Sequence, residues 1–175
     1  MTDDVEPQCP PWVSSMGGPL IVVPVSALGD WRGGRPEGNV TGPDDDYDRA
    51  CAVEEWAGVI EVGDSASALV LSGDPATTRY LPDERMFLRW LAADSEAELL
   101  AAAQVVLNDP EREWESCGVW ETDGAAVLMD SAAAGGESEE EAPVDVPAGR
   151  WNVLVMDDIE KGPSWLCLVR LVPAT

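Results

Sequence analysis

Carboxylates dominate the chemistry available to this sequence. It holds 34 aspartates and glutamates against 10 lysines and arginines, and it has no histidine. The missing histidine excludes Ser-His-Asp and Cys-His catalysis and removes the commonest general base. A carboxylate-based hydrolase stays open, since Glu61, Asp64 and Asp74 lie beside expected turns. The sequence has no phosphate-binding loop, no G-x-G-x-x-G and no G-x-S-x-G, so we predict no enzyme and no cofactor.

Three groups of acidic residues are candidates for binding a partner. They are Asp44, Asp45, Asp46 and Asp48; Glu139, Glu140 and Glu141, which follow Glu137; and Asp157 and Asp158, which precede Glu160. The net charge of -24 repels nucleic acid and anionic membranes, so we expect neither nucleic acid nor a membrane as a partner. The same charge attracts a basic protein. A nuclease is one such basic protein, because it must hold phosphates. A solvated surface that only confers solubility is the alternative for each group.

Metal binding is not indicated by the first acidic group. An EF-hand loop needs carboxylates at fixed spacing, a central glycine and a closing glutamate. The run Asp44-Asp45-Asp46-Tyr47-Asp48 has none of these features beyond its acids. We therefore predict no metal site in the chain.

The four cysteines are scattered along the chain, at Cys9, Cys51, Cys117 and Cys167. Without a C-x-x-C pair they predict neither a zinc ribbon nor a redox pair. The first residues, Met-Thr-Asp-Asp, are acidic where a secretory signal is basic, and no apolar run reaches membrane-spanning length. These features predict a reduced, cytoplasmic protein.

The elements that position these residues begin with the stretch Gly17–Pro24. Leu20 to Val23 are all large aliphatics, too short a run for an amphipathic helix, and glycines and prolines bound them. This pattern is typical of a strand buried on both faces. We expect the flanking Trp12 and Trp31 to join the same N-terminal core.

Two helices are expected. Residues 95–107 open with the capping box Ser95-Glu96-Ala97-Glu98 and repeat apolar side chains at helical spacing. Residues 44–53 place acids at a helix start, where the helix dipole favours them. On this short helix Tyr47 and Cys51 share a face that we expect to point to the core, and Asp45 can pair with Arg49.

The rest of the pattern is short strands separated by turns. It predicts an α+β fold with a mainly antiparallel sheet. The expected organisation is a loose N-terminus over residues 1–11, a single domain over 12–175, and a mobile acidic loop at 132–142.

Several short motifs then occur in a fixed order. Trp12 precedes Gly17-Gly18-Pro19 and its aliphatic run, Trp31-Arg32-Gly33 gives W-x-G, and Tyr47 to Cys51 gives Y-x-x-x-C. Together they resemble the immunity protein 21 family of bacterial polymorphic toxin systems, with likeness from about Trp12 to Val172. The resemblance implies an α+β protein that binds and neutralises a cognate toxin domain in the producing cell.

The motif residues can be structural or can bind a partner, and the acidity fits more than one kind of binding protein. Trp31 with Gly33 could anchor a partner, but burial of the ring at the edge of the core is the favoured reading. We expect Trp12, Gly17, Gly18, Pro19, Tyr47 and Cys51 to be structural as well. The acidity also fits a nucleic-acid mimic or a regulatory binding module, which would differ from an immunity protein only in its partner.

Overall fold

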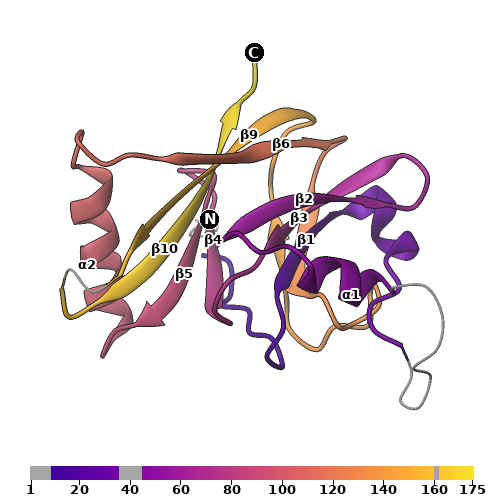
Figure 1. Ribbon diagram of the computed structural model, residues 1–175, viewed down its shortest axis with the longest axis horizontal. Helices are drawn as coiled ribbons and strands as arrows, with labels where there is room; N and C mark the ends of the chain where they lie inside the picture. Colours follow the sequence, from indigo (N-terminus) through magenta and orange to yellow (C-terminus); the bar gives the residue numbers. More distant parts are fainter. Residues whose placement is uncertain (1–8, 36–44, 160–161) are drawn as a thin grey trace, which may run out of the picture.

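The computed structural model describes residues 9–35, 45–159 and 162–175. Its strands form two five-stranded sheets, and every pairing is antiparallel (Figure 1). The sheet centred on β1 has the order β2 (Ala57–Val62), β3 (Ala66–Leu71), β1 (Leu20–Pro24), β7 (Ala126–Asp130), β8 (Glu141–Val144). The sheet centred on β10 has the order β4 (Thr77–Leu81), β5 (Met86–Ala92), β10 (Trp165–Pro173), β9 (Gly149–Asp158), β6 (Glu115–Thr122).

Three helical segments cover the outer faces of the sheets. The 3-10 helix η1 (Val25–Asp30) and the short helix α1 (Asp46–Cys51) lie on the β1 sheet, and α2 (Glu96–Leu107) lies on the β10 sheet. Figure 1 shows α2 at the left, α1 at the right and the two sheets between them. The α+β prediction is therefore confirmed, as a four-layer arrangement.

β1 is buried along its whole length, as its sequence predicts. Leu20 and Val22 point into the core between the sheets, whereas Ile21 and Val23 point to the cluster under η1 and α1. Because β3 and β7 pair with its two edges, the backbone groups of β1 are satisfied without water. A strand with both faces covered must be apolar at every position, which explains its continuous aliphatic run.

The predicted helix at 95–107 is confirmed as α2. The Ser95 hydroxyl accepts a hydrogen bond from the Glu98 backbone N–H at 3.2 Å, and the helix ends at the cap residue Asn108. Leu99 and Val106 on its inner face pack against Leu88 and Leu168 of the β10 sheet.

The placement expected for Trp12 is wrong. Trp12 packs edge-on against Trp90, with 5.4 Å between ring centroids, in the cluster on the outer face of the β10 sheet. The cause is a backbone pairing, since Val13 N donates to the Thr78 carbonyl at 2.8 Å and so attaches this segment to β4. Trp31 alone joins the core beside β1.

The acidic loop expected at 132–142 also ends earlier, because Glu141 and Ala142 belong to β8. Ala142 is fully buried opposite Leu128 of β7. The mobility of the part before β8 stays a prediction.

Candidate partner-binding surface

The motif residues near β1 meet at one turn, Asp130–Ala133, which follows β7. The Trp31 indole N–H donates to the Ser131 carbonyl at 3.1 Å, and the Ser131 hydroxyl donates to the Pro19 carbonyl at 2.6 Å. Gly34 N donates to the Ala132 carbonyl at 3.0 Å. W-x-G and Gly-Gly-Pro are therefore joined through a turn that lies 100 residues after Trp31.

Close contacts explain two of the motif glycines, one with backbone atoms and one with a side chain. Gly33 has φ +68, and a β-carbon there would lie 2.6 Å from the Ala132 carbonyl oxygen. A β-carbon at Gly18 would lie 2.5 Å from the Tyr47 hydroxyl. The contact at Gly18 puts Tyr47 of α1 against the segment that leads into β1, so a side chain at position 18 would have to displace the Tyr47 ring. At position 33 the positive φ and the backbone contact favour glycine itself.

The orientation expected for α1 is wrong in part. Ala50 is its buried residue, Tyr47 is half-buried and Cys51 is exposed. The Cys51 thiol beside the Tyr47 hydroxyl, together with partial burial, holds the pKa of Tyr47 above its usual value. Arg49 pairs with Asp46, at 3.0 Å, and not with Asp45.

The acidic residues of α1 serve the protein's own backbone. Asp45 is the N-cap: its carboxylate accepts from Asp48 N at 2.7 Å and from Arg35 N at 2.8 Å. Asp46 accepts from Arg32 N at 2.7 Å. These carboxylates hold the W-x-G segment against α1, so most of their hydrogen-bonding capacity is used within the molecule.

We expect Asp45→Ala to lower the free energy of unfolding by about 1–2 kcal/mol, because the substitution removes a helix cap and leaves backbone N–H groups without an acceptor. Chemical denaturation measures this change. Asp64→Ala is the control, since Asp64 is an exposed turn residue and should change stability by less than about 0.5 kcal/mol. Equal stability of the two variants would contradict the structural role of Asp45.

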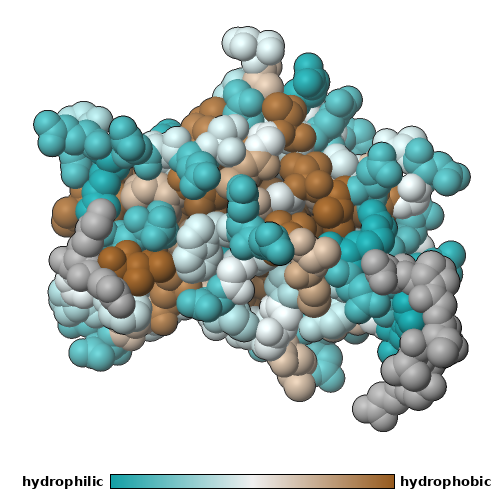
Figure 2. Space-filling model, viewed as in Figure 1, coloured by the Kyte–Doolittle hydropathy of each residue, from teal (hydrophilic) through white to brown (hydrophobic). Residues whose placement is uncertain are grey.

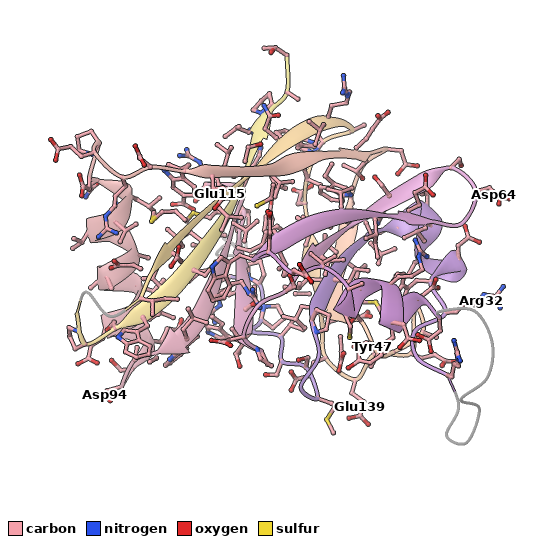
Figure 3. All side chains as sticks on the ribbon, in the orientation of Figure 1. Arg32, Tyr47, Asp64, Asp94, Glu115 and Glu139 are labelled. Atoms are coloured by element: carbon pink, nitrogen blue, oxygen red, sulfur yellow. The ribbon has the colours of Figure 1, made fainter. Side chains whose placement is uncertain are left out.

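The second acidic group lies near α1 and the turn after β7, and Figure 3 shows Glu139 below Tyr47. Glu139, Glu140 and Glu141 are all exposed. Glu140 accepts a hydrogen bond from Ser14 N at 2.8 Å and so ties the turn region to the N-terminal segment. Asp44 of the first group and Glu160 of the third lie outside the described residues.

One member of the third acidic group, Asp157, lines a cleft of about 610 Å³ at one end of the β10 sheet, which we call the acidic cleft. It forms where β6 begins opposite the last part of β9, with Glu115 paired to Val155. Its carboxylates are those of Glu111, Glu113, Glu115 and Asp157, and the half-buried ring of Trp114 lines it. Asp158 is turned aside and pairs with Arg112 at 3.0 Å.

A cleft of this composition suits a cationic side chain. Carboxylates attract lysine or arginine, and an indole face adds a cation–π contact when the cation is partly desolvated. Figure 3 places Glu115 on β6, and Figure 2 shows hydrophilic and hydrophobic residues side by side over this part of the view. Sequence analysis found Asp157 and Asp158 but missed Glu111, Glu113 and Glu115. These glutamates alternate with Arg112 and Trp114 just before an expected strand, and this pattern could have indicated them.

A second acidic hollow, the hairpin recess, was also missed. It measures about 620 Å³ and lies between η1, the β2–β3 turn and the β6–β7 link. Of the described residues that line it, none is basic and five are acidic: Asp30, Glu61, Asp64, Glu121 and Asp123. Figure 3 shows Asp64 at the edge of the molecule opposite α2. The hairpin recess has no aromatic lining residue, which distinguishes it from the acidic cleft.

The three carboxylates considered for hydrolysis do not share one site. Glu61 and Asp64 line the hairpin recess, whereas Asp74 lines a separate cleft of about 330 Å³ beside Trp56. Within residues 9–35, 45–159 and 162–175, no three acidic or cysteine side chains are arranged to hold a metal ion.

The four cysteines differ in burial, and we expect their reactivity to differ accordingly. Cys9 and Cys51 are exposed, while burial raises the pKa of Cys117 to about 11 and that of Cys167 to about 12.

We expect Ellman's reagent to label Cys9 and Cys51 quickly in the folded protein, Cys117 slowly, and Cys167 only after unfolding. Cys51→Ser should remove one fast thiol. If it removes none, the exposed position of Cys51 is wrong.

Comparisons with known proteins give one match. Neither the curated proteins nor the solved structures contain a match to this chain. No helix in the described part of the chain has the length and apolar character needed to cross a membrane. One family model, described as immunity protein 21, matches residues 11–163, a range that includes every motif residue from Trp12 to Cys51. Because the match spans most of the sequence, the chain belongs to the immunity protein 21 family.

Proposed function

We propose that this chain binds a cognate toxin domain and neutralises it in the bacterium that makes both, as part of a polymorphic toxin system. The observation that carries the proposal is the family match over residues 11–163. The mechanism is stoichiometric binding that covers or distorts the active site of the toxin, without chemistry by the immunity protein. A reducing cytoplasm is the expected compartment, since all four cysteines are free.

The partner we propose is basic, as a nuclease domain would be. A net charge of -24 accelerates association with a cationic surface and makes that association sensitive to salt. The acidic cleft supplies the contact, because it combines exposed carboxylates with the ring of Trp114. The α1 carboxylates are a poorer choice, since Asp45 and Asp46 already bind backbone N–H groups.

Growth rescue tests the proposal. Each toxin domain encoded beside this gene is expressed in a sensitive host, with and without the chain, and growth is followed. Rescue from one toxin, with no rescue from an unrelated toxin of the same activity, is the expected result. Failure to rescue from any neighbouring toxin contradicts the proposed function. Capture of a nucleic-acid-binding host protein in its place would favour the nucleic-acid mimic.

A further inference from the structure

Helix α2 carries fewer charged side chains on its outer face than an ordinary surface helix does. From Leu99 to Leu107 its nine residues carry no charge, in a chain of which 25% is charged. Leu99, Ala103 and Val106 form the buried inner face. A surface helix ordinarily carries charged residues along the length of its outer face, so this uncharged stretch is unusual.

The outer face of α2 is nevertheless open. The exposed fraction of Val105 is 70% and that of Leu100 is 38%, and Ala97 and Ala101 are exposed beside them. The exposed polar residues Gln104 and Asn108 hydrogen-bond to each other: the Gln104 amide donates to the Asn108 side-chain oxygen at 3.2 Å. Figure 2 shows hydrophobic residues on the left of the molecule, where Figure 1 places α2.

A groove of about 500 Å³ runs along this helix. Ala101, Ala102 and Val105 form one side of it, and residues 162–164 form the other. Its acidic lining residues are Asp94, Glu98 and Asp158, and Figure 3 shows Asp94 at the lower left. Among the described residues that line it, Arg112 is the basic one, and it is paired with Asp109 at 3.4 Å and with Asp158 at 3.0 Å.

We propose that the outer face of α2 and its groove form the anchoring part of the toxin interface, and that they bind a toxin segment with large apolar side chains flanked by lysine or arginine. The proposal rests on the proposed function and names the surface that performs it. An interface needs an apolar centre with a polar rim. In the groove, Val105 with Ala101 and Ala102 supplies the apolar part beside the carboxylates of Asp94 and Glu98, and Leu100 adds a second exposed apolar side chain on the outer face of the helix.

Charge selects this occupant over a second copy of the chain. Two copies would bring carboxylates against carboxylates on molecules that each carry -24, whereas basic residues would pair with the same rim. The groove also adjoins the acidic cleft, because Arg112 lines both and Asp157 and Asp158 are neighbours in β9. A toxin placed on α2 would therefore reach the acidic cleft as well.

The test uses the toxin domain that the wild-type chain neutralises in the growth experiment. Leu100→Gln with Val105→Gln keeps good helix formers at exposed positions, and an unchanged unfolding midpoint checks the fold. We expect the dissociation constant to rise about 10- to 100-fold, mainly through faster dissociation. Met16→Gln with Val25→Gln is the matched control, because both residues are exposed apolar side chains away from α2, and it should stay within about twofold.

Two results would overturn the inference alone. One is unchanged toxin affinity of the α2 variant while wild-type rescue persists. The other is a wild-type dimer, seen by sedimentation, that Leu100→Gln with Val105→Gln dissociates, since a second copy would then be the occupant. If the wild-type chain neutralises no toxin, the proposed function fails and the inference fails with it.

Discussion

Replacing Trp31 with alanine is expected to lower the free energy of unfolding by about 3–5 kcal/mol, the usual cost of removing a buried tryptophan. The exposed fraction of Trp31 is 1%, and its ring packs in the cluster between β1, η1 and α1. Its indole N–H also joins W-x-G to the turn after β7, through the Ser131 carbonyl. Denaturant unfolding followed by circular dichroism measures the loss.

Two variants separate packing from hydrogen bonding at this position. Trp31→Phe keeps most of the apolar contact but loses the indole N–H, so we expect a smaller loss of about 1–3 kcal/mol. Trp165→Ala is the comparison for a half-buried tryptophan, and it should cost less than Trp31→Ala. If Trp31→Ala changes stability by under about 1 kcal/mol, the ring does not hold this junction together.

Reversing two charges in the acidic cleft is expected to slow toxin association by roughly tenfold at low salt and to flatten its dependence on ionic strength. The variant is Glu113→Lys with Asp157→Lys, two exposed residues whose replacement should leave the fold intact. Stopped-flow association with the neutralised toxin, measured over a range of salt concentrations, gives both quantities. Dissociation should change less, because steering acts on the encounter.

The matched control reverses the same number of charges in the hairpin recess. Asp64→Lys with Glu121→Lys changes the net charge by an equal amount on a different part of the surface. Steering that depends on the acidic cleft predicts a clearly smaller effect for this control. Equal slowing by both pairs would show that total charge matters and place no contact in the cleft.

Local sequence pattern was sufficient to predict the helices and strands whose signals lie within their own residues. The all-aliphatic run of β1 indicated burial on both faces, and Ser95 with the following apolar period indicated α2. The hairpin of β2 and β3 followed from two apolar runs around Gly63 and Asp64. In each case the signal lies within a few residues, so no tertiary information is needed.

The division of the strands into two sheets could not be predicted from local sequence pattern. β6 and β7 are joined by the short link at Asp123 and Gly124, yet they belong to different sheets. Trp120 of β6 turns into the core between the sheets and donates its indole N–H to the Ser67 carbonyl of β3 at 3.0 Å. Nothing in the sequence near Trp120 identifies a partner 53 residues earlier.

The candidate surface was predicted only in part, for the same reason. Asp157 was found from its local acidic run, but the acidic cleft also needs Glu111, Glu113 and Glu115, which the pairing of β6 with β9 brings beside it. The α1 acids were the most conspicuous run, and the structure uses Asp45 and Asp46 to hold its own backbone. An acidic run therefore shows where charge is, whereas its hydrogen-bond partners decide whether the charge is available.

A titration of toxin activity by this chain tests the central claim most directly. The purified toxin is held at a fixed concentration far above the expected dissociation constant, and its activity is measured as the chain is added. Stoichiometric neutralisation predicts a linear fall to zero at one chain per toxin, independent of incubation time after mixing. Inhibition that continues to grow with time at substoichiometric amounts, or no inhibition by an equimolar amount, would contradict neutralisation by binding.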